Sequence, residues 1–213
     1  MITVYHLGVS QSDRVVWILE ELNIPYKLEW FDRGEDLLAP KEYRALHPVG
    51  TSPIIRDGDT VLAESAAIVE YISQKYGDGR LSVAPSEENY ADYLYWMQFN
   101  SNVMAMFFAK SVQSKEADAS STFSTALSRR EEAYYQHLNE RLGETPYLAG
   151  EQFSCADIMA AFSLTTMPLF GGRKIDDLSN VGPYLERITS RPAYIKAMEI
   201  AGPNASRPSD SVD

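Results

Sequence analysis

The order of hydrophobic periodicities along the first part of the chain constrains its fold most. Residues 2–7 (ITVYHL) are rich in strand-forming residues and precede Gly8, so they predict a short buried strand. Residues 13–22 carry apolar side chains at helical spacing, and residues 26–30 predict a second strand. Two strands joined through a helix run parallel. The chain is therefore expected to begin with a β-α-β unit.

A hairpin and a further helix complete this first region. Residues 53–63 hold two short β-rich runs on either side of the turn signal DGD, which predicts a β-hairpin. Residues 65–76 follow with apolar side chains at helical spacing, and Gly77 is expected to end that helix. Together these elements predict an α/β domain over residues 1–78, which is within the usual domain size.

The remainder of the chain is predicted to be helical. Residues 79–85 form a short stretch containing glycine and proline that is typical of a linker. Residues 86–202 carry helical patterns only and predict an all-helical domain. Residues 203–213 are expected to form a disordered tail.

Two serines in the helical half are placed to begin helices. Ser86 is followed by two glutamates, which are favourable in a first helical turn. Ser154 has Asp157 three residues later, and this spacing matches a capping box.

Charge and composition limit the classes of partner. The chain has 213 residues, a net charge of −11 and a pI of about 4.8. Nucleic acid and anionic membrane surfaces repel such a protein, so neither is expected as a partner. A single cysteine, Cys155, excludes an internal disulfide, and the three histidines form no metal-ligand motif. With neither a signal-peptide pattern nor a bilayer-length apolar run, the protein is expected to be cytoplasmic.

The chain resembles the glutathione transferase superfamily in four stretches that keep the family's order and spacing: YHLGVSQSDRVVWILEELNIPY, HPVGTSPIIRDGDTVLAESAAIVEYI, YLAGEQFSCADI and SRPAYIKAM. The segments TSPII and AES look most like bacterial and fungal members of the serine-type branch. This resemblance implies an α/β thioredoxin-like N-terminal domain and an all-α C-terminal domain. One departure is Gly50-Thr51, where many relatives have Gly-Lys, so a cationic contact to the ligand is missing.

Members of this family make a thiolate from the thiol of glutathione. A free thiol has a pKa of about 8.5, so only a few per cent is ionised at neutral pH. A hydrogen bond to a charged partner contributes about 1.5–3 kcal/mol, which lowers a pKa by roughly one to two units. The resemblance implies that Ser10 donates to the sulfur and that Ser12 caps the following helix. From the residues alone, either Ser10 or Ser12 could cap the helix. Tyr5 is a weaker candidate for contact with the sulfur.

The resemblance also implies which residues hold the tripeptide. Pro53 matches a proline that is cis in the family, and Ser52 before it would pair strand-like with the cysteinyl part. Glu64 would accept from the ammonium of the γ-glutamyl end, while Ser65 and free helix N–H groups hold its carboxylate. Arg14 is either a cation that favours the thiolate or a surface residue paired with a glutamate. Taken alone, Ser65 is a good N-cap and Pro53 an ordinary strand-starting proline.

A second-substrate pocket is the remaining element of the expected site. Met104, Phe107 and Phe108 lie within one helical segment and are candidates to line it. A stripe of methionine and aromatic residues at helical spacing is equally typical of a core or of a dimer interface.

The sequence therefore predicts a cytoplasmic, homodimeric glutathione transferase of a detoxification type. Glutathione would be its co-substrate, no further cofactor would be needed, and a small hydrophobic electrophile would accept the thiolate. The alternatives are a glutathione-dependent peroxidase or disulfide reductase, and a non-catalytic glutathione-binding module. Cysteine-type oxidoreductase relatives have a cysteine where Ser10 stands, which favours the transferase.

Overall fold

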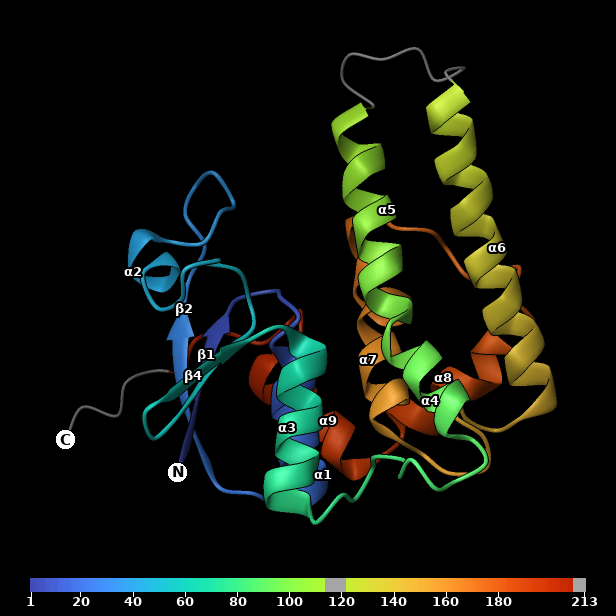
Figure 1. Cartoon of the computed structure of the whole chain (residues 1–213). Coiled ribbons are helices and arrows are strands. Elements are labelled where there is room, and N and C mark those ends of the chain that lie inside the picture. Colours follow the sequence, from blue (N-terminus) through green and yellow to red (C-terminus); the bar gives the residue numbers. More distant parts are fainter. Residues whose placement is uncertain (114–121, 209–213) are drawn as a thin grey trace. The chain divides into compact units, whose positions relative to one another are not determined.

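The computed structural model describes residues 1–113 and 122–208 of the chain, which divides into two compact units (Figure 1). Unit 1 consists of Met1–Ser82 together with the chain from Thr189 onward, and unit 2 of Val83–Ile188. Unit 1 contains β1 (Ile2–Leu7), α1 (Asp13–Leu22), β2 (Tyr26–Phe31), α2 (Lys41–Arg44), β3 (Ile54–Asp57), β4 (Thr60–Ala63), α3 (Ser65–Gly77) and α9 (Pro192–Ala201).

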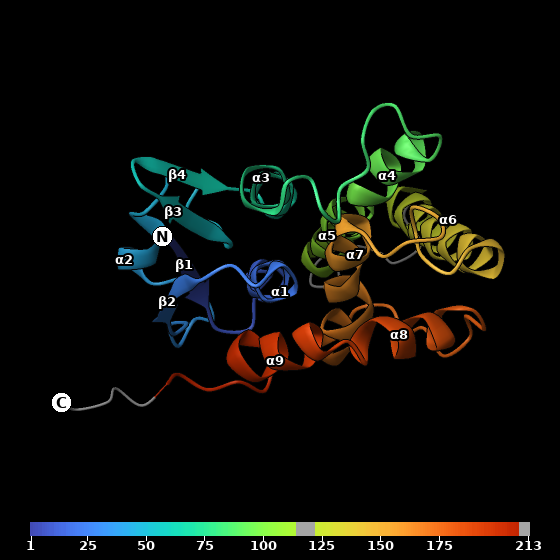
Figure 2. The same cartoon turned by 90° about the horizontal axis from the view of Figure 1, so that it is seen from below.

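The sheet of unit 1 has the strand order β2-β1-β3-β4. Strands β1 and β2 are parallel, with Ile2 opposite Tyr26, whereas β3 is antiparallel to both β1 and β4. Helices α1 and α3 lie on one side of the sheet and α2 on the other (Figure 2). The predicted β-α-β unit and hairpin are both confirmed. Strand β2 ends one residue later than expected, and β3 begins after Pro53 and ends at Asp57, within the turn signal.

Alternation along β1 decides which side chains reach the start of α1. Neighbouring side chains on a strand point to opposite faces of the sheet. Tyr5 and Leu7 pack with Tyr43 of α2 on one face. His6 points to the other face, where its ring contacts Ser12 just before α1. Strand β1 therefore presents the His6 imidazole, and not the Tyr5 phenol, toward the loop that carries Ser10.

The two long helices of the α/β region end in residues with left-handed backbone. Asn23 follows α1 with a φ of 55°. Helix α3 ends at Gly77, as predicted, with the glycine as its last helical residue, and Asp78 takes the left-handed capping position with a φ of 53°. A Cβ on Gly77 would lie only 3.0 Å from a methyl carbon of Leu22. The glycine therefore allows α1 and α3 to approach each other.

Helix α9 packs against α1 and so belongs to unit 1. The rings of Trp17 and Tyr194 meet edge to face with centroids 4.8 Å apart. Arg191 donates from two nitrogens to the Glu21 carboxylate at 2.6 and 2.7 Å. The expected helical domain of residues 86–202 thus differs from unit 2, because contacts with α1 place its last helix in unit 1. Of the expected tail, residues 209–213 lie outside the described residues.

Unit 2 contains α4 (Tyr90–Met97), α5 (Phe99–Gln113), α6 (Thr122–Glu144), α7 (Cys155–Thr165), the 3-10 helix η1 (Met167–Phe170) and α8 (Val181–Thr189), whose last residue falls in unit 1. The prediction that Ser86 begins a helix is wrong, because α4 starts after Asn89. The predicted capping box of α7 is confirmed. Ser154 accepts from the Ala156 N–H, and Asp157 accepts from the Ser154 N–H at 2.8 Å.

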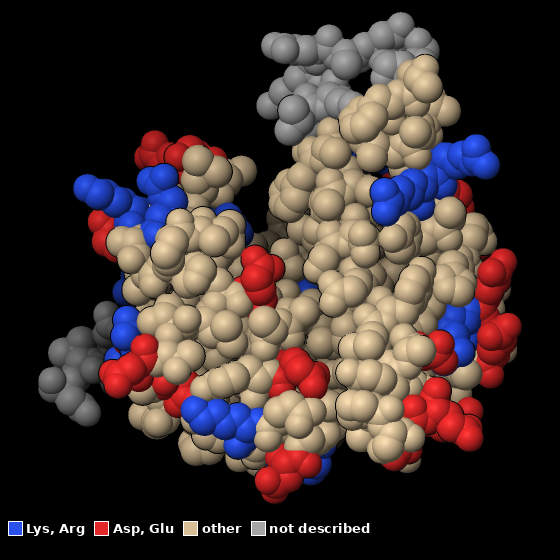
Figure 3. All heavy atoms as spheres, in the orientation of Figure 1, with Lys and Arg blue, Asp and Glu red and all other residues tan. Residues whose placement is uncertain are grey.

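Charged side chains of both signs share the surface. On the face drawn in Figure 3, lysine and arginine side chains lie beside aspartate and glutamate, with uncharged surface between these groups. Among the described helices, none combines the length and the apolar character that crossing a bilayer requires.

Candidate active site

The loop between β1 and α1 carries the predicted catalytic serine and is held by an arginine. Val9 has a φ of 49°, a backbone conformation that a β-branched residue rarely adopts. Arg33 donates from Nε to the Gly8 carbonyl and from one terminal nitrogen to the Val9 carbonyl, both at 2.9 Å. Its other terminal nitrogen reaches the Leu37 carbonyl at 2.9 Å. The guanidinium therefore fixes the backbone that leads into Ser10.

Ser10 is the centre of a cluster of hydroxyl groups. Its side chain is 6% exposed, and its Oγ donates to the Leu7 carbonyl at 2.6 Å. The same Oγ lies 2.7 Å from the hydroxyl of Ser12 and 2.8 Å from that of Ser52. The Ser52–Pro53 peptide bond is cis. The structure thus brings Ser10, Ser52 and Pro53 together from segments about forty residues apart.

Ser12 occupies the N-cap position of α1 but does not cap it with its side chain. Its hydroxyl instead contacts Ser10 and lies 2.8 Å from Nδ1 of His6. Ser12 therefore stands at the predicted N-cap position, but the prediction that its side chain caps the helix is wrong. A buried imidazole offers the hydroxyl a partner that the sequence pattern does not show.

Arg14 and Ser65 join the first turns of two helices. Arg14 is 1% exposed, which excludes the interpretation of a surface residue paired with a glutamate. Its Nη1 donates to Ser65 Oγ at 3.3 Å. Burial lowers the pKa of Arg14 to about 10, and the adjacent Asp13 opposes that shift. A positive charge is thus held beneath the N-terminus of α3.

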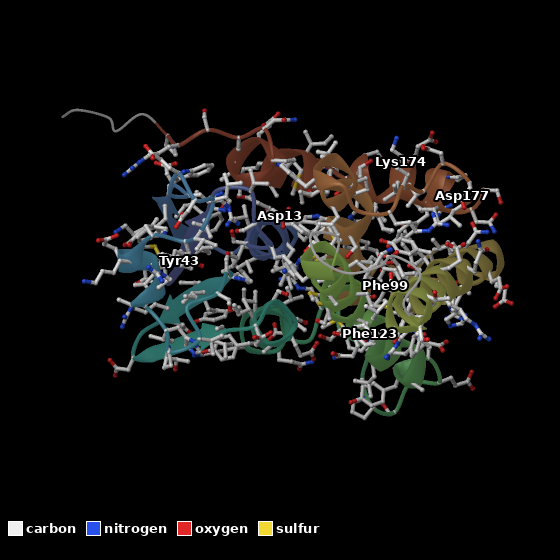
Figure 4. The ribbon with its side chains drawn as sticks, turned by 90° about the horizontal axis from the view of Figure 1, so that it is seen from above. Asp13, Tyr43, Phe99, Phe123, Lys174 and Asp177 are labelled. Atoms are coloured by element: carbon white, nitrogen blue, oxygen red, sulfur yellow. The ribbon has the colours of Figure 1, made fainter. Side chains whose placement is uncertain are left out.

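Asp13 is a buried carboxyl group in the first turn of α1 (Figure 4). Burial raises its pKa to about 7, while the charge of Arg14 and a hydrogen bond from the Arg14 N–H act in the opposite direction. Its Oδ1 accepts that N–H at 2.6 Å. The pair therefore places ionisable groups of both signs next to the serine cluster.

Glu64 and Ser65 form the junction between β4 and α3. Glu64 has a φ of 73°, and its carbonyl accepts the Ile68 N–H at 2.9 Å. A non-glycine residue in this conformation carries strain, which often marks a functional position. Glu64 is the N-cap residue and Ser65 begins the helix, so the interpretation of Ser65 as the N-cap is wrong. The side chain of Glu64 is exposed, whereas that of Ser65 is buried.

Tyr5, the weaker candidate for contact with the sulfur, makes contacts on the opposite face of the sheet. Its hydroxyl accepts from Nε of Arg56 at 3.1 Å, and its ring packs with Phe31 and Tyr43. Figure 4 shows Tyr43 on α2. The contacts of Tyr5 therefore fit the alternative interpretation of a buried strand aromatic.

The residues predicted for a second-substrate pocket differ in their surroundings. Met104 packs in the core of unit 2 with Phe162 and Met167, and Phe107 is half-buried against this cluster. Phe108 is 56% exposed. Their contact with a second substrate stays a prediction.

Two residues near Ser10 were missed as site residues by reasoning from sequence. In the sequence, His6 is one of three histidines without a metal-ligand motif, and Arg33 belongs to no recognisable pattern. Only their positions, one in β1 and the other after β2, could have pointed to the loop between β1 and α1.

Among the described residues, His, Cys, Asp and Glu do not gather in threes that could hold a metal.

Comparisons with known proteins identify the family of the chain. Residues 10–75 match the family described as glutathione S-transferase, N-terminal domain, and residues 99–192 match the corresponding C-terminal domain. Glutathione S-transferase 3 of Schizosaccharomyces pombe is 34% identical, with 93% of this chain and 87% of the relative covered.

Solved structures show the same architecture. A glutathione S-transferase from Actinobacillus pleuropneumoniae is 32% identical with a TM-score of 0.85, and the match covers 99% of this chain and 98% of the other. A theta-class enzyme from Xanthomonas axonopodis pv. citri, solved with glutathione bound, shares the fold at 24% identity and a TM-score of 0.71, over 94% and 98% of the two chains. A thioredoxin-like sheet followed by a helical unit defines the class. The chain belongs to the glutathione S-transferase family and is a glutathione transferase.

Proposed function

We propose that unit 1 binds glutathione across the β1–α1 loop, the Ser52–Pro53 step and the N-terminus of α3, and that Ser10 stabilises its thiolate. The observation that carries this proposal is the 2.8 Å contact between the hydroxyls of Ser10 and Ser52. Ser52 is the residue expected to pair with the cysteinyl part of the tripeptide. A sulfur held there lies next to the Ser10 hydroxyl.

Stabilisation of the thiolate requires only that one hydrogen changes its partner. The Ser10 hydroxyl now donates to the Leu7 carbonyl. A negatively charged sulfur is a stronger acceptor than a neutral carbonyl, so the hydrogen turns toward it when glutathione binds. The thiol proton is released to solvent. The positive end of α1 adds a favourable field at the same place.

The γ-glutamyl end suits the junction between β4 and α3. The exposed carboxylate of Glu64 can accept from the ammonium. The free N–H groups in the first turn of α3 and the Ser65 hydroxyl can hold the carboxylate. Arg14 reinforces this end because its buried charge is hydrogen-bonded to Ser65.

Once formed, the thiolate attacks an electrophilic carbon of a small hydrophobic compound. A sulfur–carbon bond forms. Either a carbon–halogen bond breaks and a halide ion leaves, or an activated double bond takes up the electron pair and then a proton from solvent. Peroxide reduction by the same thiolate is the alternative activity. A homodimer with a detoxification role in the cytoplasm completes the proposal, as the resemblance to the family implies.

The test combines calorimetry with turnover in Ser10→Ala, with Ser206→Ala as a matched control at an exposed position. We expect Ser10→Ala to bind glutathione nearly as tightly as the wild type. Glutathione bound to this variant should have a thiol pKa that is higher by roughly one to two units. Turnover at neutral pH should fall by roughly ten- to a hundredfold, because less of the thiol is ionised.

Parallel assays of conjugation, peroxide reduction and disulfide reduction identify the main reaction. The proposal fails if the wild type gives no heat with glutathione, or if Ser10→Ala keeps full activity. Binding without any turnover would instead support the non-catalytic binding module.

A further inference from the structure

His6 is buried at the end of the serine cluster, although it does not reach the proposed substrate. Its side chain is fully buried and its ring packs on Trp30 with centroids 4.3 Å apart. Nδ1 lies 2.8 Å from the hydroxyl of Ser12, which is 2.7 Å from that of Ser10. An unbroken row of polar atoms therefore leads from the imidazole to the proposed thiolate site.

The direction of the hydrogens in this row follows from the Leu7 carbonyl. A hydroxyl group has one hydrogen to donate and two lone pairs that accept. A carbonyl oxygen can only accept, so the hydrogen of Ser10 is committed to Leu7. The contact between the two hydroxyls therefore requires Ser12 to donate its hydrogen to Ser10 Oγ, which also accepts from the Ser12 N–H at 3.4 Å. Since Ser12 has given its own hydrogen to Ser10, it can only accept from His6.

The other ring nitrogen of His6 leads to the same conclusion. Nε2 is buried, and no described residue offers it a hydrogen-bonding partner. A buried N–H without an acceptor is rarer in proteins than an acceptor without a donor. The single proton of the neutral ring therefore resides on Nδ1. Burial, with a smaller contribution from the charge of Arg33, lowers the pKa of His6 to about 4, so the ring is neutral at physiological pH.

We infer that His6 is a positioning residue, whose Nδ1–H starts a one-way row of hydrogen bonds through Ser12 to Ser10. This inference rests on the proposed role of Ser10. Because Ser10 Oγ accepts from both the hydroxyl and the N–H of Ser12, its own hydrogen is directed away from Ser12, to the Leu7 carbonyl or to a bound sulfur. Hydrogen bonds in a chain polarise one another, so the Ser10 hydroxyl becomes a stronger donor.

The first test needs no ligand. Nitrogen-15 NMR of the histidine side chains in the free protein distinguishes the two neutral forms of His6, with His6→Asn used to assign its signals. We expect a protonated Nδ1 and an unprotonated Nε2. The opposite tautomer would reverse the row of hydrogen bonds and overturn the inference. This measurement is independent of whether the protein turns over any substrate.

The second test measures the pKa of bound glutathione from the ultraviolet absorbance of its thiolate in two variants. His6→Asn keeps an N–H near the position of Nδ1 and should stay close to the wild type. His6→Phe keeps a ring but removes the donor. It should raise the bound thiol pKa by about half a unit, which is about threefold less thiolate at neutral pH. His137→Phe, at an exposed histidine of unit 2, is the control.

The outcomes separate this inference from the proposed function. A thiol pKa in folded His6→Phe equal to that of the wild type overturns the inference, while Ser10→Ala still tests the role of Ser10. If Ser10→Ala leaves the thiol pKa unchanged, the proposed function fails, whatever tautomer NMR shows. Should His6→Phe not fold, the tautomer in the wild type and the thiol pKa in His6→Asn decide the question.

Discussion

The guanidinium of Arg14 lies 3.3 Å from the hydroxyl of Ser65, although 51 positions separate the two residues. This contact joins the first turn of α1 to the first residue of α3. The buried positive charge adds to the positive end of the α3 dipole. A carboxylate at the N-terminus of α3 would therefore meet two favourable fields, one from the helix and one from the side chain below it.

Replacing Arg14 should weaken both the fold and the binding of glutathione. In Arg14→Gln the buried Asp13 loses the adjacent charge that favours its ionised form. Losing the charged hydrogen bond from Arg14 to Ser65 should destabilise the protein by roughly 1.5–3 kcal/mol. We also expect the dissociation constant for glutathione to rise about tenfold, since a hydrogen-bonded charge near the carboxylate is lost. Urea unfolding and calorimetry measure the two effects.

The exposed Arg44 provides the matched control for this variant. Arg44→Gln should leave both unfolding and binding unchanged. If Arg14→Gln were as stable as the wild type and bound glutathione equally well, Arg14 would have no role in the site.

The buried carboxyl of Asp13 should make stability depend on pH. Folding raises its pKa from 3.8 to about 7. Between these values the unfolded chain has lost the proton and the folded chain keeps it, so stability decreases as pH rises. Asp13→Asn removes this dependence and keeps an acceptor for the Arg14 N–H. The variant should therefore gain stability relative to the wild type on the order of 1.4 kcal/mol per pH unit from about 4 to about 7.

His6 contributes the opposite slope, so the comparison must be between variant and wild type at each pH. Folding lowers the pKa of His6 from 6.5 to about 4, and the stability from this group is lost as pH falls between those values. This contribution cancels in the difference, because both proteins contain His6. Asp59→Asn, at an exposed position, is the control. A constant difference between Asp13→Asn and the wild type across this range would contradict the assignment.

The sequence predicts the elements of unit 1 well because local signals and tertiary packing agree there. Residues 2–7 and 13–22 form the predicted strand and helix, since their apolar periodicities match the surfaces that they bury. Helix α9 shows where such reasoning ends. Its start at Pro192 follows the local rule for proline at a first helical position. Its packing on α1 depends on contacts such as that between Arg191 and Glu21, 170 positions apart.

The candidate site shows the same division. Ser10, Ser52 and Ser65 could be singled out because each stands at a junction between elements. His6 could not, because nothing local distinguishes a histidine that contacts a serine hydroxyl from a strand residue in a core. Ser12 is an example of a residue whose partner cannot be inferred from local sequence. Its N-cap position was evident, but its true partner lies on another element.

The capping box of α7 should be a major source of stability in unit 2. The buried carboxylate of Asp157 accepts from the N–H groups of Leu148 and Ser154 and from the Tyr184 hydroxyl, at 3.0, 2.8 and 3.0 Å. Asp157→Ala leaves these three donors without their acceptor, so it should lower the free energy of unfolding by roughly 3 kcal/mol or more. Urea unfolding measures the change, with the exposed Asp176→Ala as control. A loss no larger than that of the control would contradict this role.

Arg33 should matter for turnover more than for stability. Its three hydrogen bonds hold the carbonyls of Gly8, Val9 and Leu37, and Val9 has the strained φ of 49°. In Arg33→Met the loop loses these bonds and can relax, which displaces the Ser10 hydroxyl. We expect kcat/KM to fall about tenfold, because small misplacements of a catalytic group have large effects on rate. The midpoint of urea unfolding should change little, since the side chain is exposed.

The shape of the guanidinium provides a sharper form of this test. Lysine keeps the charge of Arg33 but cannot present three donors in a rigid planar arrangement. Arg33→Lys should therefore resemble Arg33→Met in kcat/KM, whereas Arg129→Met, at an exposed position in unit 2, should match the wild type. Full activity in Arg33→Lys would mean that only the positive charge near the loop matters. Full activity in Arg33→Met would mean that the loop holds Ser10 without help from this side chain.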